Sequence, residues 1–208
     1  MMTPRTLEAA LTELGTLAHA EGKVIDLAVY GGSALMLASN FRVATQDVDA
    51  VAESDQSSVN RLAAVIAQRH GWPADWINDG VRTYLSPNVD GVSGHHQLLR
   101  AYPSEQQPGL RVFVPTAEYI LAMKLMSMRI DESSGKSDLA DIINLLGVVG
   151  LKSPDDVIKF ASGFYPEARV SGRLLLGIGA LWRIKDTLTV ECPDGSPRYL
   201  GRSGPAPK

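Results

Sequence analysis

The stretch VYGGSALMLASNFRVATQDVDAV, residues 29–51, contains the pattern from which the fold is predicted. Its first residues close an apolar, β-rich run over residues 24–30, which is typical of a buried strand. Two glycines stop this run, and residues 33–38 have the composition of a short helix. Residues 45–52 then alternate as a second strand. The stretch therefore predicts two strands with a glycine turn and a helix between them.

The segments on either side of this stretch complete an α+β pattern. Periodicity predicts helices over 3–22 and 58–71 and a hairpin of strands over 96–102 and 110–114. The segment 72–96 is rich in Gly, Asn, Asp, Ser and Pro, so it is predicted to be a loop with at most a short helix around Trp76. We expect a small mixed β-sheet flanked by helices over residues 1–115.

The second half of the chain has a different character. Four successive helical patterns cover residues 116–129, 137–150, 154–164 and 167–186. Because no long linker separates the halves, residues 116–192 are expected to form a helical bundle half that packs on the sheet core, with a cleft at the junction. Residues 193–208 are rich in Pro and Gly and are predicted to be a disordered tail.

The composition excludes several classes of protein. With 20 Lys plus Arg against 23 Asp plus Glu, the net charge is -3, unlike proteins that bind nucleic acid mainly by neutralising phosphates. One cysteine, Cys192, excludes a disulfide framework. His95 and His96 lie in a Gly/Ser-rich segment and are interpreted as a loop pair. No apolar run has the roughly 20 residues that a membrane helix needs, so we expect a soluble, cytoplasmic protein.

Two features of the opening stretch are suited to nucleotide chemistry. Gly31, Gly32 and Ser33 lie between a strand end and a helix, where backbone N–H groups favour an anion and glycine lets a phosphate approach the backbone. Asp47 and Asp49 alternate on a strand and therefore share one face, roughly 6.5 Å apart. Two carboxylates so close repel each other unless a cation such as Mg²⁺ lies between them.

Each feature alone has a simpler structural explanation. A Gly-Gly pair after a strand is usually a turn, and an Asp-x-Asp pair usually belongs to a solvated strand face. An Asp-x-Asp pair also occurs in glycosyltransferases, although the upstream Gly-Gly-Ser fits a triphosphate better. The combination favours function, because the two carboxylates interrupt an otherwise apolar strand whose other face is Val48 and Ala50.

These residues carry a resemblance to a known family. The order hydrophobic-Gly-Gly-Ser, a spacer and Asp-hydrophobic-Asp resembles the signature of the DNA polymerase β-like nucleotidyltransferase superfamily. In the second half, EYILAMKL at 118–125 and KSDLADI at 136–142 resemble the second motif of the AbiEii-type nucleotidyltransferase toxins of toxin–antitoxin systems. The matches together span residues 30–146. The resemblance implies a nucleotidyltransferase core over 1–115 that precedes the helical half.

The resemblance also implies roles for individual residues. Asp47 and Asp49 would bind Mg²⁺ or Mn²⁺, and Lys124 would reach the nucleoside triphosphate (NTP). Even without the resemblance Lys124 is unusual, because it lies in the apolar stripe of its helix. The structural alternative to a role in nucleotide binding is a lysine that snorkels along the edge of the core. Asp138 and Asp141 are expected either to hold Lys124 or to contribute directly to the site, although acidic residues at a helix start are favoured by the dipole alone.

Two departures from the family pattern concern the same site. Arg42 resembles the arginine that precedes the acidic pair, but it is shifted by one residue relative to Arg-x-Ser/Thr-x-Asp, whereas Thr45 occupies the hydroxyl position. The third carboxylate that many superfamily members have on a later strand is absent from both predicted hairpin strands. The metal site is therefore expected to be a reduced one, or the protein to be inactive.

The resulting hypothesis is a metal-dependent enzyme that transfers NMP from an NTP to a hydroxyl acceptor. By resemblance the acceptor is a tRNA 3′ end, the role is that of a toxin, and the partner is a cognate antitoxin protein. RNA would need a local basic patch, for which the candidates are Arg42, Lys124, Arg129 and Lys136. The alternatives are a degenerate nucleotidyltransferase fold that acts as a binding module, and a small-molecule nucleotidyltransferase of antibiotic-modifying type.

Overall fold

The computed structural model describes two compact units of the chain. The described residues are 1–91, 94–128, 136–170, 172–187 and 197–200. The first unit contains 1–38, 42–83 and 91–115, and the second contains 39–41, 84–90 and 116–208. The main division therefore falls between residues 115 and 116, where the sequence changes character. Each unit is described by itself below.

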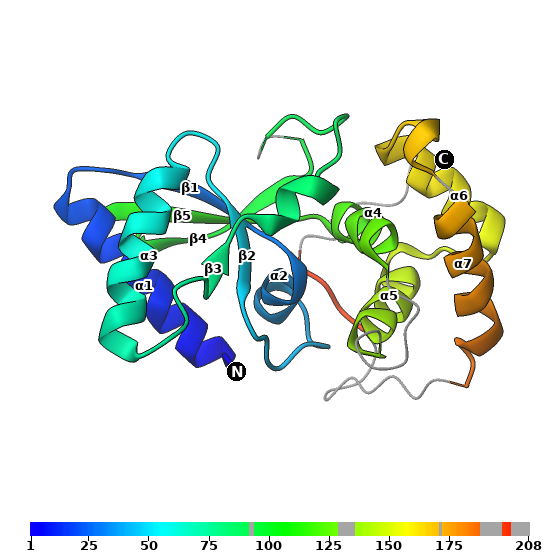
Figure 1. Cartoon of the computed structure of the whole chain (residues 1–208), viewed down its shortest axis with the longest axis horizontal. Helices are drawn as coiled ribbons and strands as arrows, with labels where there is room; N and C mark the ends of the chain where they lie inside the picture. Colours follow the sequence, from blue (N-terminus) through cyan, green and yellow to red (C-terminus); the bar gives the residue numbers. More distant parts are fainter. Residues whose placement is uncertain (92–93, 129–135, 171, 188–196, 201–208) are drawn as a thin grey trace. The chain divides into compact units, whose positions relative to one another are not determined.

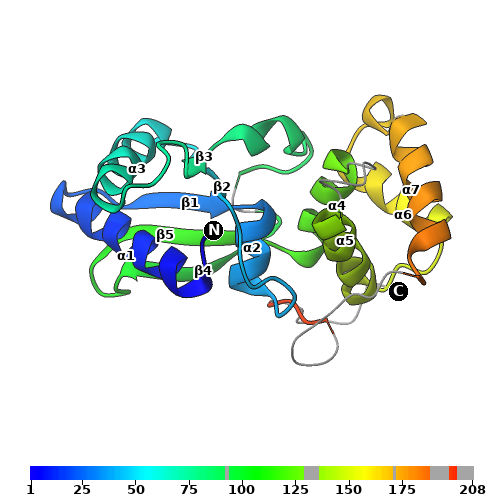
Figure 2. The same ribbon diagram turned by 60° about the horizontal axis from the view of Figure 1, so that its bottom comes forward.

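The first unit is built on a five-stranded mixed sheet (Figures 1 and 2). In chain order the elements are α1 (Pro4–Ala20), β1 (Ile25–Val29), α2 (Gly31–Ala38), β2 (Val48–Val51), α3 (Gln56–His70), β3 (Ile77–Asn78), η1 (Gly80–Tyr84), β4 (His96–Pro103) and β5 (Pro108–Pro115). The strand order is β3-β2-β1-β5-β4, with β1 parallel to β5 and antiparallel to β2. The prediction of an α+β fold with a small mixed sheet and flanking helices is confirmed.

Helix α1 covers β4 and β5 and contacts α3 (Figure 1). Its start is determined locally, because the Thr3 side chain accepts a hydrogen bond from the Thr6 N–H and Pro4 occupies the first turn. It approaches the hairpin closely through two glycines. A Cβ at Gly15 or at Gly109 would lie under 3.0 Å from backbone atoms of the opposing element, so neither position has room for a side chain.

The hairpin of β4 and β5 is confirmed, whereas the prediction of a loop over 72–96 is wrong in part. The segment contributes β3, which adds to β2 in parallel, and the short 3-10 helix η1. Trp76 is buried and donates its indole N–H to the Ala63 carbonyl 3.0 Å away in α3, which ties the segment to the core. A two-residue strand is too short to produce a periodic pattern, so the sequence had no signal for β3.

The second unit is helical. Its elements are α4 (Ala117–Ser127), α5 (Lys136–Val149), α6 (Pro154–Phe164), η2 (Glu167–Arg169) and α7 (Gly172–Ile184). Helix α4 packs on α5 and α6, and α6 packs on α7. The single helix predicted over 167–186 is wrong, since η2 precedes a separate α7. Within the predicted tail, Tyr199 is buried and forms an isolated β-bridge with Ser39. Residues 197–200 therefore depart from the predicted disorder. Residues 193–196 and 201–208 lie outside the described residues.

Helices long and apolar enough to cross a bilayer are absent from the described parts of the chain.

Candidate active site

One end of the sheet collects polar residues from four strands. Strands β1 and β5 finish at this end, while β2, β3 and β4 begin there, because β2 and β4 run antiparallel to their neighbours β1 and β5. Asp49 lies in β2 and Asp47 immediately precedes it. Gly31 and Gly32, which we call the glycine turn, are the first residues of α2 and follow β1 after Tyr30. The backbone N–H of Tyr30 donates to the Asp49 carbonyl at 2.8 Å, which joins the turn to the acidic strand.

Asp47 and Asp49 lie on the same face of β2, as the alternation predicts. Asn78 of β3 is the direct register partner of Asp49, so the two side chains share a face of the sheet. The Asn78 side-chain amide lies 3.5 Å from Asp47 Oδ2, so the Asp47 carboxylate is on that face as well. Asp47 is exposed and Asp49 is half-buried. Two carboxylates therefore lie on the same face of the sheet at this end of it.

The Asp49 carboxylate lies directly against Gly31. A Cβ at Gly31 would be well under 3.0 Å from Asp49 Oδ2, and the φ of Gly31 is +60°, in the left-handed region. The backbone conformation thus favours glycine at this position, and a Cβ there would displace the Asp49 carboxylate. Gly31 therefore leaves the backbone uncovered beside a carboxylate.

A Gly31→Ala variant is expected to displace the Asp49 carboxylate and to lower stability by about 1–2 kcal/mol, the cost of a left-handed non-glycine residue. The matched control is Gly71→Ala, because Gly71 has a φ of +65° but nothing within 4 Å of its Cβ position. Urea unfolding should give similar losses of stability for both variants. Mn²⁺ titration should show weakened binding for Gly31→Ala alone; equal Mn²⁺ affinity in the two variants would contradict the assignment.

Arg42 and Thr45 lie beside Gly32. A Cβ at Gly32 would be 3.0 Å from Thr45 Oγ1 and 3.7 Å from Arg42 Cζ. Thr45 is buried and donates its hydroxyl to the Asp47 carbonyl at 3.0 Å, which braces the start of β2. The structure therefore brings Arg42 to the glycine turn despite its shifted spacing in the sequence. A guanidinium at this position is suited to a phosphate oxygen.

Ser33 differs from the other members of the motif. Its side chain is buried, and its hydroxyl donates to the Tyr30 carbonyl at 3.2 Å and to the Asp47 carbonyl at 3.4 Å. Ser33 thus connects the end of β1 to the start of β2 within the protein. The predicted contact between its side chain and a phosphate stays a prediction.

Sequence reasoning missed the pair formed by Tyr30 and His96. His96 is the first residue of β4, and its Nε2 lies 2.9 Å from the hydroxyl of Tyr30, with the two rings edge to face. The strand predicted from residue 96 is confirmed, whereas the interpretation of His96 as part of a loop pair was wrong. Burial, and then the charge of His95, lower the pKa of His96 from 6.5 to about 4, so the imidazole is neutral at pH 7. The pair holds the residue that immediately precedes Gly31.

The lowered pKa of His96 predicts a pH dependence of stability. The unfolded chain takes up the proton near pH 6.5, whereas the folded protein does so only near pH 4, so stability falls as the pH falls through this window. His96→Gln removes this contribution and retains a side chain that can bond Tyr30. Urea unfolding at pH 7 and pH 4.5 should show a smaller loss for the variant than for the wild type. Equal losses would contradict a neutral buried imidazole.

Lys124, Asp138 and Asp141 form a separate cluster in the second unit. The Lys124 ammonium lies 2.6 Å from Asp138 Oδ1 and 2.8 Å from Asp141 Oδ2, so both acids hold it. The Lys124 and Asp141 side chains are 9% and 3% exposed, and that of Asp138 is 33% exposed. Snorkelling does not describe this lysine, because its ammonium is buried with its carbon chain. The predicted triphosphate role of Lys124 stays a prediction.

The described residues thus bring together Gly31, Gly32, Arg42, Asp47 and Asp49, and join Lys124 to Asp138 and Asp141. Arg129 and the side chain of Lys136, predicted for an RNA patch, lie outside the described residues. A cluster of three or more His, Cys, Asp or Glu side chains able to hold a metal does not occur in the described ranges. No protein-family model, curated protein or solved structure matches the chain.

Proposed function

We propose that the protein is a metal-dependent nucleotidyltransferase whose nucleotide site is the glycine turn and the Asp47–Asp49 edge of the sheet. The observation that carries the proposal is the position of the Asp49 carboxylate directly against left-handed Gly31, with Asp47 on the same face. A carboxylate pair beside a bare backbone turn is suited to a cation that also contacts a phosphate.

Two carboxylates are sufficient for Mg²⁺ at such a site. This ion keeps several waters and is usually bound through one or two carboxylates together with the phosphates of the substrate. The oxygen ligands of Asp47 and Asp49 fit Mg²⁺ or Mn²⁺, and an NTP would complete the coordination. A third acidic strand residue is not needed for this mode of binding.

The groups around the glycine turn would have different roles in the reaction. The backbone at Gly31 and Gly32 and the Arg42 guanidinium hold the phosphates of the NTP. When bound, the metal ion supplies charge neutralisation at the phosphates. The acceptor oxygen forms a bond to the α-phosphorus as the bond to pyrophosphate breaks, and one of the two carboxylates accepts the hydroxyl proton.

The acceptor and the biological role rest on the family resemblance. We propose a tRNA 3′ end as the acceptor and a toxin neutralised by an antitoxin protein as the role. Because the net charge is -3, RNA would be held by a local patch of few basic residues. Binding of RNA is therefore expected to be modest and to decrease as the salt concentration rises, with a shallow slope because few phosphates are contacted.

A second candidate function has one observation in its favour. The resemblance implies that Lys124 contacts the triphosphate, but its ammonium already forms ion pairs with Asp138 and Asp141. Its charge is therefore compensated within the helical unit. This arrangement fits a degenerate nucleotidyltransferase fold that binds nucleotide without transferring it.

These two functions, and the alternative of a small-molecule nucleotidyltransferase, are separated by incubating the protein with each labelled NTP and Mg²⁺. The acceptor offered is either total RNA or a panel of aminoglycosides. Label on RNA that disappears with Asp49→Ala supports the proposed enzyme, and label on an aminoglycoside identifies a small-molecule enzyme instead. Binding of Mg·NTP without transfer to any acceptor supports the binding module. If neither binding nor transfer occurs, the proposed site is wrong.

A further inference from the structure

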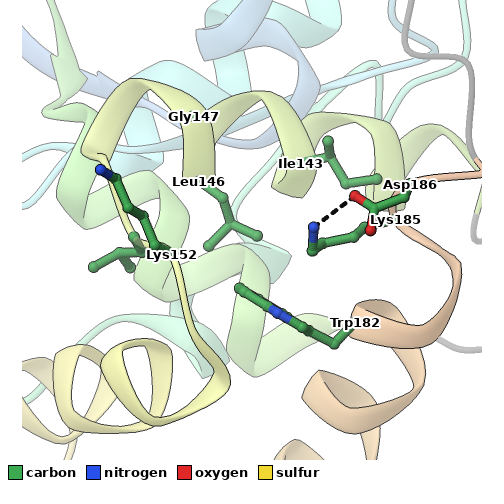
Figure 3. Close-up of a pocket in the computed structure, with 8 residues that line it drawn as sticks. Ile143, Leu146, Gly147, Lys152, Trp182, Lys185 and Asp186 are labelled. Atoms are coloured by element: carbon green, nitrogen blue, oxygen red, sulfur yellow. Dashed lines mark hydrogen bonds and ion pairs between the residues drawn. The ribbon is translucent and has the colours of Figure 1, made fainter.

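A pocket in the helical unit lies between α5 and α7, in the described part of the chain. Figure 3 shows Leu146 of α5 and Trp182 of α7 on opposite sides of this space, with Lys152 at its margin. The volume of the space is about 320 Å³. This volume is at the small end of the range for small-molecule pockets, about 300–1,000 Å³. Its lining residues are Ile143, Leu146, Gly147, Leu151, Lys152, Trp182, Lys185 and Asp186. None of them belongs to the candidate active site.

The pocket is open because of the way in which the helices pack. Helix α4 contacts α5 and α6, and α6 contacts α7, so α5 and α7 are joined mainly through the helices between them. Gly147 lies on the pocket side of α5, and a Cβ there would meet nothing within 4 Å. A larger residue at this position would therefore partly fill the space.

The wall of the pocket is apolar and aromatic. Leu146 is buried, and Ile143, Leu151 and Trp182 are each half-buried, so these side chains present carbon surface to the space. The Lys185 ammonium lies 5.5 Å from the centre of the Trp182 ring, which shows that a cation and an aromatic face already meet at this wall. A flat ring is the ligand shape that such a wall accommodates.

The charges at the rim favour an anion. Lys185 forms an ion pair with Asp186 at 2.6 Å, so these two charges largely cancel. Lys152, at the other side of the pocket, is exposed, and no ion-pair partner for its ammonium occurs among the described residues. One positive charge is left at the edge of an apolar space.

We propose that the α5–α7 pocket is a binding site for a small aromatic carboxylate, with the ring against Leu146 and Trp182 and the carboxylate at Lys152. The ligand is a single flat ring system, because the space is small, and it carries one negative charge, because one lysine is uncompensated. The site is independent of the proposed nucleotidyltransferase activity.

The test uses the full-length protein and two probes of equal shape, naphthalene-2-carboxylate and its neutral counterpart naphthalene-2-methanol. Titration calorimetry should show the carboxylate binding up to about fivefold more tightly, the difference expected for one partly exposed charge pair. The Lys152→Gln variant should remove this difference and retain binding of the neutral probe. Equal affinities for the two probes in the wild-type protein, or no binding of either, would overturn the proposal.

The position of the site is tested by Gly147→Leu, which should weaken binding of both probes at least tenfold. Leucine is a better helix former than glycine, so the variant should remain folded. The matched control is Gly163→Leu in α6, an exposed helical glycine that also has nothing within 4 Å of its Cβ position and does not line the pocket. If Gly147→Leu binds the probes as well as Gly163→Leu does, the ligand lies elsewhere and the proposal fails.

Discussion

An Asp49→Asn variant is expected to lose NMP transfer by about 10³-fold or more while it remains folded. The substitution keeps the size of the side chain against Gly31 but removes the negative charge that would hold the metal ion, and metal stabilisation of transition-state charge amounts to several kcal/mol. Initial rates with labelled NTP at saturating Mg²⁺ measure the loss. Direct titration with Mn²⁺ should show the corresponding loss of affinity.

The matched control is Asp26→Asn in β1, another half-buried aspartate of the same sheet. Asp26 pairs with Arg111 through two hydrogen bonds of 2.6 and 2.7 Å, away from the glycine turn. This variant should lose at most about 1 kcal/mol of stability, since the pair is partly exposed, and should keep its transfer rate. If Asp49→Asn transfers as fast as Asp26→Asn, the carboxylate edge is not the active site.

A Lys124→Ala variant is expected to lower the free energy of unfolding by about 3–5 kcal/mol, the usual cost of leaving a buried charge without its partner. The side chain of Asp141 is 3% exposed, so its carboxylate cannot be hydrated when the ammonium is removed. The control is Arg61→Ala, because Arg61 is 53% exposed in its pair with Glu21 and should contribute far less to stability than a buried pair does. Urea unfolding curves provide the comparison. Similar losses for Lys124→Ala and Arg61→Ala would contradict a buried, structural cluster.

A triple replacement separates the two roles of Lys124. With Lys124→Met, Asp138→Leu and Asp141→Leu, no charge is left unpaired, and such replacements of buried ion clusters are often neutral for stability or favourable. If Lys124 contacts the triphosphate, this folded variant should bind NTP more weakly than the wild type. Unchanged NTP affinity would assign the cluster to the packing of α4 on α5 alone.

The sequence was informative where a pattern is local. The strand that precedes Gly31 and Gly32 and the acidic pair at β2 follow from alternation and from turn chemistry, which act over a few residues. The hairpin of β4 and β5 and the caps of the helices follow for the same reason. The short strand β3 and the contact between His96 and Tyr30 could not be predicted, because pairing with distant strands, and not periodicity, places these residues.

By itself the sequence determined an α+β chain with a glycine turn, a carboxylate pair on one strand face and a lysine within an apolar helix stripe. Only the tertiary structure decided which groups meet. The order of the strands brings Asn78, Tyr30 and His96 to the acidic edge, and the packing of α4 on α5 gives Lys124 two carboxylates. The reason is physical, since periodicity determines the face on which a residue lies, whereas strand pairing and helix packing determine what lies opposite it.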